Sequence, residues 1–98
     1  MARALTVSRA TVPVGAETEY LRLLGRLARL GEERGRHLWV FRARDRAGSF
    51  LEFSESGALE MHRAMGAPAE DEARLESRLR ELAAYEPGAW DLWEEVTL

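Results

Sequence analysis

The chain contains no cysteine, lysine, asparagine, glutamine or isoleucine. Without cysteine there is no disulfide framework, no thiolate metal site and no thiol nucleophile. All 14 basic residues are arginine, so a lone arginine is weak evidence for a site that selects arginine over lysine. The histidines, His37 and His62, stand apart in the sequence and do not form a metal-binding pattern. We expect no bound metal.

Long apolar runs are missing as well. No stretch approaches the about 18 consecutive apolar residues of a membrane-spanning helix, and residues 1–15 lack the apolar segment of a signal peptide. We therefore expect a cytoplasmic protein with no membrane partner. The net charge of −3 provides no excess of positive charge for binding phosphates, so we expect no nucleic-acid partner. Neither a nucleophile elbow nor a phosphate-binding glycine loop is present.

The chain has 98 residues, of which 46% are hydrophobic and 32% charged, and this composition fits one small globular domain over residues 1–98. Strand-like and helix-like apolar spacings alternate along it, with breaks at glycine and proline. The expected elements are a strand at 4–12, a helix at 16–34, strands at 37–44 and 49–55, a short helical turn at 57–65, a helix opened by Pro68 and ended by Pro87, and a strand at 89–98.

This βαββαβ order predicts an α+β protein with a ferredoxin-like fold. Because βαβ crossovers are right-handed, both helices are expected on one face of a four-stranded antiparallel sheet. The helical apolar stripe at Leu75, Leu79 and Leu82 is expected to face that sheet. The other face of the sheet has no helix to cover it.

The faces of the hairpin follow from the position of its turn. A four-residue turn at 45–48 gives one face that suits the helices and one that stays uncovered, although a register shifted by one residue would swap the faces. An uncovered apolar face indicates an interaction site, and a second copy of the sheet would cover it. The first face comprises Leu38, Val40, Leu51 and Phe53, and the second comprises Trp39, Phe41, Phe50, Glu52 and Ser54.

The segment 50–62, FLEFSESGALEMH, resembles the antibiotic-biosynthesis-monooxygenase-like group of dimeric α+β barrel proteins, in which such a strand runs into a small helical segment ending in a histidine. The resemblance spans nearly the whole chain. It implies a ferredoxin-like protomer, a homodimer whose two sheets pack into a barrel, and oxidation of a small organic ligand by oxygen with no bound cofactor. Where that group usually has an aromatic residue, this chain has Ser54, Glu55 and Ser56, and of the Asn, Trp and His set of the haem-degrading branch only His62 can be matched.

The candidate catalytic residues are His62 and Glu52. An imidazole that titrates near neutral pH can serve as a base, although a surface or structural role is the alternative for His62. On the expected register Glu52 shares an apolar face with Phe41 and Phe50, where burial would raise its pKa and make it a base. The alternative for Glu52 is exposure at the sheet edge or an ion pair with Arg9 on the first strand.

The candidate ligand-binding residues come from the same sheet. His37 and Trp39 are two positions apart and are expected to point together into the barrel. Trp90 and Trp93 are expected on opposite faces of the last strand, one in the core and the other in the barrel or the dimer contact. The full ligand-binding set is Arg9, His37, Trp39, Phe41 and Phe50.

Three functions compete. The first is a homodimeric small-molecule-binding α+β barrel protein that acts as a cofactor-free, monooxygenase-like enzyme on a small organic substrate. The second is a non-catalytic dimeric ligand-binding or regulatory module, with the pocket holding a ligand or filled by Trp39 and Phe50. The third is an RNA-recognition motif, which has the same element order, but Gly48 stands where its third strand needs a stacking aromatic residue, so this function is disfavoured.

Overall fold

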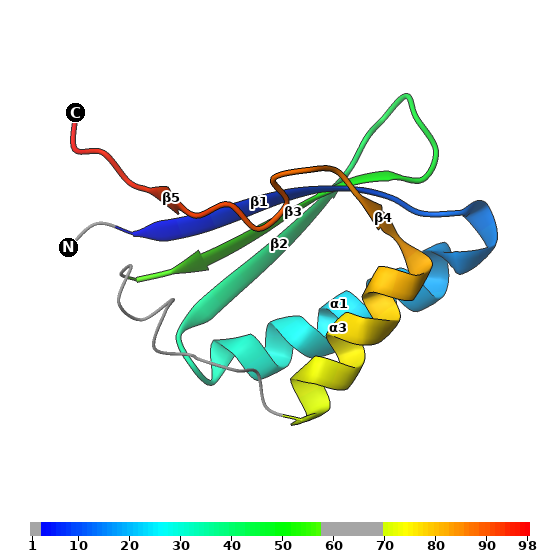
Figure 1. The fold of residues 1–98 in the computed structure, drawn as a ribbon, viewed down its shortest axis with the longest axis horizontal. Helices are drawn as coiled ribbons and strands as arrows, with labels where there is room; N and C mark the ends of the chain where they lie inside the picture. Colours follow the sequence, from blue (N-terminus) through cyan, green and yellow to red (C-terminus); the bar gives the residue numbers. More distant parts are fainter. Residues whose placement is uncertain (1–2, 58–69) are drawn as a thin grey trace.

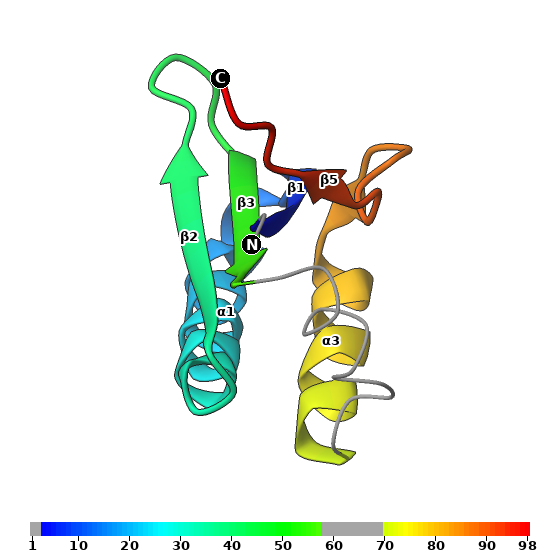
Figure 2. The ribbon, with the colours of Figure 1, turned by 90° about the vertical axis from the view of Figure 1, so that its left-hand side faces the viewer.

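The computed structural model describes residues 3–57 and 70–98, and its strands form one antiparallel sheet in the order β2-β3-β1-β4, with β5 also paired to β1. Two helices lie side by side on one face of this sheet (Figures 1 and 2). The predicted α+β fold class is confirmed. The elements are β1 (Ala4–Thr11), the 3-10 turn η1 (Val14–Ala16), α1 (Glu17–Glu32), β2 (Arg36–Arg42), β3 (Ser49–Ser56), α3 (Glu70–Leu82), β4 (Ala84–Tyr85) and β5 (Trp93–Glu94).

The two helices bury their apolar stripes against the sheet. On α3, Leu75 and Leu79 are buried as the spacing predicts, and Leu82 is packed against the same core. Acidic residues occupy the first turn of each helix, where their negative charge interacts favourably with the positive end of the helix dipole. The buried core consists of Ala10, Val12, Tyr20, Leu23, Leu24, Phe50, Leu75, Leu79 and Ala83.

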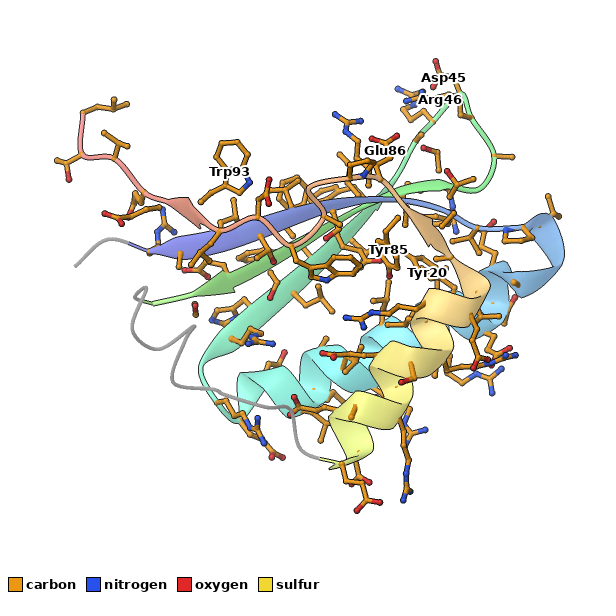
Figure 3. The ribbon with its side chains drawn as sticks, in the orientation of Figure 1. Tyr20, Asp45, Arg46, Tyr85, Glu86 and Trp93 are labelled. Atoms are coloured by element: carbon orange, nitrogen blue, oxygen red, sulfur yellow. The ribbon has the colours of Figure 1, made fainter. Side chains whose placement is uncertain are left out.

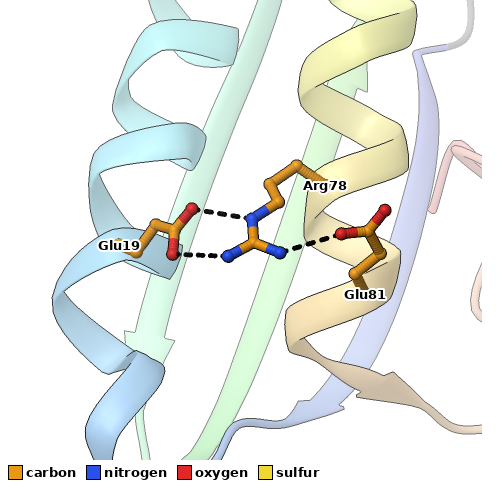
Figure 4. A network of polar contacts seen from close by, with 3 residues as sticks. All are labelled: Glu19, Arg78 and Glu81. Carbon is orange, nitrogen blue, oxygen red and sulfur yellow. Dashed lines mark hydrogen bonds and ion pairs between the residues drawn. The ribbon is translucent and has the colours of Figure 1, made fainter.

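An arginine joins the two helices at the surface (Figure 4). Arg78 on α3 donates from Nε and Nη2 to the two carboxylate oxygens of Glu19 on α1, at 2.8 and 3.0 Å. Its Nη1 donates to Glu81 one turn along α3, at 2.8 Å. The guanidinium lowers the pKa of the Glu19 carboxyl through these hydrogen bonds. The planar guanidinium thus links the two helices at this end.

The register of the hairpin differs from the predicted one. Arg42 pairs with Phe50, so seven residues, 43–49, lie between the last paired residues of the hairpin. The predicted turn at 45–48 has four residues, and the change from an even to an odd number shifts the register by one. The prediction for β3 was therefore wrong by one residue, which moves every β3 side chain to the opposite face. We call the face covered by α1 and α3 the helix face and the other the open face. The helix face of the hairpin carries Leu38, Val40, Phe50, Glu52 and Ser54, and the open face carries Trp39, Phe41, Leu51 and Phe53.

The predicted strand at 89–98 was also wrong in extent. Two short strands take its place on the same edge of β1: β4 pairs at Ala10 and Thr11, and β5 pairs at Ala4 and Leu5. Between them the chain turns at Pro87 and Gly88. Proline has no N–H for a ladder, and Gly88 has a φ of 81°, so continuous pairing stops there.

The end of the hairpin connection is held against β1 by a glycine. Gly48 has a φ of 76°, and its carbonyl accepts a 2.7 Å hydrogen bond from the Val12 N–H. A Cβ at this position would lie 2.3 Å from the Val12 carbonyl oxygen. Both the backbone conformation and the close approach of β1 therefore require glycine.

We expect Gly48→Ala to lower the free energy of unfolding by about 2–3 kcal/mol, because it combines a strained φ with a backbone clash. Urea denaturation measures this change. Gly25→Ala is the matched control, since an added methyl group there meets nothing within 4 Å on the exposed side of α1 and should stabilise the helix by about 0.5–1 kcal/mol. Equal stabilities for the two variants would contradict the described contact with Val12.

Candidate functional site

A cavity of about 330 Å³ lies between the helix face of the sheet and the two helices. Its size is at the lower end of the range for small-molecule sites. The segment between β4 and β5 also contributes to its lining. The apolar lining residues are Leu24, Leu27, Ala28, Leu38, Leu79 and Leu92, and the charged ones are Arg36, Glu52, Glu72, Glu76 and Arg80.

The floor of the cavity consists of small side chains on the two central strands. Thr6 of β1 lies opposite Ser54 of β3, and Ser8 occupies the next row of the same face. Helices normally pack against large apolar side chains, so these small residues leave space beneath α1 and α3. One row further along, Phe50 fills that space by packing against Tyr20, with ring centroids 4.9 Å apart. The cavity therefore ends at these two rings.

Glu52 lies on the wall of the cavity between two tyrosines. The hydroxyl groups of Tyr20 on α1 and Tyr85 on β4 both donate to its Oε2, each at 2.7 Å. Figure 3 shows the two tyrosines approaching from the helix and from the edge strand. No described residue donates a hydrogen bond to Oε1 of this cavity-lining carboxylate.

The burial of this cluster changes the acidity of all three groups. Desolvation raises the pKa of Glu52 above its ordinary value, and the two hydrogen bonds from the tyrosines only partly oppose this. Burial and the neighbouring Glu52 also raise the pKa of both Tyr20 and Tyr85. The tyrosines therefore remain protonated donors at neutral pH, while Glu52 is a stronger base than an exposed carboxylate.

An aromatic residue beyond the sheet edge closes one side of the cavity. The Trp90 ring lies 5.2 Å from the Tyr85 ring, and the guanidinium of Arg80 sits 4.9 Å above the Trp90 ring. Ser8 Oγ donates to the Ala89 carbonyl at 2.5 Å, which ties this segment to β1. Trp90 thus lines the cavity, and Trp93 lies opposite Leu5 on β1. Both rings are more than half exposed, so the prediction that one of the two tryptophans lies in the core was wrong.

The structure separates the predicted site residues into two groups. Glu52 and Phe50 are on the helix face because of the register shift, so the prediction that they share a face with Phe41 was wrong. The alternative, an ion pair between Glu52 and Arg9, was also wrong, since Arg9 lies opposite Leu51 on the open face while Glu52 accepts hydrogen bonds from the two tyrosines. Phe50 is buried in the core against Tyr20.

The remaining predicted residues line the open face. His37 stacks on Trp39 with ring centroids 5.8 Å apart, and Phe41 meets Phe53 edge-on at 5.5 Å. The side chains of Trp39 and Phe41 are 46% and 57% exposed, so this face is accessible in the protomer. His62 lies outside the described residues, and its role stays a prediction.

Sequence reasoning missed Tyr20 as a partner of Glu52, and it missed Tyr85 and Trp90 as cavity residues. The Tyr20 ring packs in the core on the apolar side of α1, while its hydroxyl group bonds Glu52. A buried tyrosine hydroxyl needs a polar partner, and this requirement was the signal that pointed to a buried acceptor such as Glu52. No comparable signal existed for Tyr85 or Trp90, because their positions depend on the break between β4 and β5.

A second hollow, of about 310 Å³, lies at the hairpin end of the sheet. Its lining includes Asp45, Arg46 and Glu86, which are labelled at the top of Figure 3, and also Arg9 and Arg42. Arg42 forms an ion pair with a carboxylate of α1. Opposite charges are therefore mixed in this hollow, and it does not select one sign of ligand charge.

Solved structures share the fold of this chain. SnoaB, a cofactor-independent oxygenase from Streptomyces nogalater, aligns over 100% of this chain and 95% of its own, with a TM-score of 0.76 and 20% identity. An antibiotic biosynthesis monooxygenase aligns over 100% and 99%, with a TM-score of 0.71 and 13% identity. This chain has the antibiotic biosynthesis monooxygenase fold.

The same monooxygenase fold occurs in a conserved protein of unknown function from Bacteroides thetaiotaomicron, a possible oxidoreductase, which aligns over 96% of both chains with a TM-score of 0.76 and 14% identity. At these identities the likeness concerns the fold alone. By sequence, no protein-family model and no curated protein matches the chain. Neither helix described here is long and apolar enough to cross a membrane, and residues 3–57 and 70–98 contain no group of three potential metal ligands.

Glu52→Gln tests the burial of the carboxyl group through the pH dependence of stability. The pKa of Glu52 is higher in the folded state than in the unfolded state. At pH values between the ordinary and the raised pKa, the folded state therefore binds more protons than the unfolded state. The stability from protonated Glu52 is present below its ordinary pKa and is lost as pH rises through the raised pKa. The wild-type minus Glu52→Gln difference in unfolding free energy should fall across that window, by at most about 1.4 kcal/mol per pH unit.

Urea unfolding of both proteins at a series of pH values measures this difference, and the other titrating groups cancel in the subtraction. A difference independent of pH would show that Glu52 titrates as an exposed carboxyl group, against the described position.

Proposed function

We propose that this protein oxidises a small organic substrate with molecular oxygen, using no bound cofactor, and that Glu52 is the base that activates the substrate. The observation that carries the proposal is a carboxyl group of raised pKa, held by two tyrosines, on the wall of a mostly apolar cavity. The shared fold with SnoaB, a cofactor-independent oxygenase, supports the same chemistry.

The first step is removal of a proton from the substrate. A substrate with an acidic C–H or phenolic O–H can place that group against Oε1 of Glu52, while Tyr20 and Tyr85 hold Oε2. The fixed hydrogen bonds orient the carboxylate, and the raised pKa brings its basicity closer to neutral pH, where a general base is most effective. The proton then resides on Glu52, and the substrate becomes an electron-rich anion.

The second step transfers electrons from this anion to oxygen. The substrate carbon bonds to dioxygen and forms a peroxide anion, which takes back the proton from Glu52 to become a hydroperoxide. The hydroperoxide then loses water, with cleavage of the O–O bond and loss of the second hydrogen of that carbon, to leave a carbonyl group. The sum for a methylene substrate is CH₂ + O₂ → C=O + H₂O, so the substrate supplies all the electrons and no reductant is needed. The leucines of α1 and α3 provide an apolar wall for the organic part of the substrate.

We also propose that the protein works as a homodimer through the open face. This face presents Leu51 and Phe53 beside the exposed Trp39 and Phe41. Exposed apolar patches of this kind mark interfaces, and the resemblance to dimeric α+β barrel proteins implies a second copy as the partner. In this arrangement His37, Trp39, Phe41 and Arg9 form contacts between protomers, while the cavity lies on the other side of each sheet.

Oxygen consumption tests the catalytic proposal. We expect anthrone, or another polycyclic compound with an acidic methylene or phenol group, to be oxidised with uptake of oxygen, and Glu52→Gln to lower kcat at least about 100-fold, as for loss of a general base. The matched control is Glu55→Gln, because Glu55 is on the same strand and lies opposite His37 on the open face.

Equal rates for the wild type and Glu52→Gln would remove Glu52 from the mechanism. Binding of these compounds without oxygen uptake would instead identify a non-catalytic ligand-binding module.

Native mass spectrometry tests the dimer. We expect the wild type to be dimeric at micromolar concentration and Phe41→Asp to be monomeric, since a charge in the centre of an apolar interface costs about 2 kcal/mol or more. Val14→Asp is the control, because Val14 is 80% exposed in η1, away from the sheet face. A monomeric wild type would contradict the proposed interface.

A further inference from the structure

Arg36 stands on the helix face of β2 and lines the same cavity as Glu52. Its Nε is buried and has no hydrogen-bond partner. A buried donor on a charged group without an acceptor is unfavourable, so such groups in native proteins require an explanation.

Two other charged groups of the cavity wall have partners of their own. Glu72 forms an ion pair with Arg34, at 3.3 Å, and Arg80 lies over the Trp90 ring. Among the cavity-lining residues that the structure describes, no side chain forms an ion pair or ring contact with the Arg36 guanidinium. The Arg36 guanidinium therefore has no direct acidic partner among these cavity residues.

The sheet sets the distance between this cation and the proposed base. Arg36 lies opposite Ser56, and Val40 lies opposite Glu52, so the two functional residues are separated by four positions along one face. That spacing corresponds to about 13 Å of strand. The row between them carries Leu38 and Ser54, and it forms part of the cavity floor. A ligand in the cavity can therefore approach Glu52 with one end and Arg36 with the other.

We infer that Arg36 is a specificity-determining residue that binds a carboxylate at the end of the substrate remote from the oxidised position. Arginine offers two parallel N–H groups that match the two oxygens of a carboxylate. Because Nε is enclosed in the present packing, the guanidinium turns toward the cavity when it binds. No ion pair has to break for this rotation. The inference rests on the proposed function, because it takes the cavity as the substrate site.

A matched pair of ligands tests the inference without turnover. Naphthalene-2-carboxylate and naphthalene-2-carboxamide have nearly the same shape, but only the first is charged. Calorimetric titration of the wild type should show about ten- to a hundredfold tighter binding of the carboxylate, the range expected for a charged hydrogen bond in an enclosed site. Arg36→Met should bind both compounds within about twofold of each other, whereas the control Arg44→Met, in the exposed hairpin connection, should keep the preference.

A measurement on the unmutated protein keeps the test valid if Arg36→Met does not fold. In ¹H–¹⁵N NMR spectra, the Nε–H resonance of Arg36 should shift on addition of the carboxylate and stay in place on addition of the carboxamide. Equal affinities of the wild type for the two compounds, no binding of either, or a preference that survives in Arg36→Met would each overturn the role of Arg36. Oxygen uptake by a neutral substrate would still support the proposed function, so the two proposals fail separately.

Discussion

The register between β2 and β3 is the constraint on which the rest of this structure depends. It is fixed by the odd-length connection at 43–49 and by the contact of Gly48 with Val12. In this register Phe50 becomes part of the core and Glu52 enters the space beneath the helices. A shift of one residue would place a carboxylate on the open face and remove the aromatic ring that packs against Tyr20.

The buried carboxylate is unfavourable for folding, and its surroundings limit that cost without removing it. Two tyrosine hydroxyls satisfy one oxygen, while the other has no described donor. A structural carboxylate is normally satisfied on both oxygens or paired with a cation. Retaining a partly satisfied acid in an apolar cavity is the type of local compromise that proteins accept at functional sites.

The sequence predicted the fold well because the fold depends on long, regular patterns. The apolar stripe of α1, the stripe at Leu75 and Leu79, and the turn residues after each element all specify the βαββαβ order. The site was predicted less well, since it depends on a single residue of register and on the break between β4 and β5. Glu52 was recognised as unusual, but its partners Tyr20 and Tyr85 come from distant elements whose meeting no local pattern encodes.

The small residues Thr6, Ser8 and Ser54 on the cavity floor have a consequence for how this scaffold can evolve. Their side chains set the volume above the sheet, whereas the backbone groups of the same residues hold the two central strands together. Ligand size and sheet integrity are therefore controlled by different atoms of the same positions. At Thr6 and Ser54, exchanges among serine, threonine, alanine and valine can reshape the space for a new molecule while the backbone pairing of β1 with β3 persists. Ser8 is the exception, because its hydroxyl group also holds the Ala89 carbonyl.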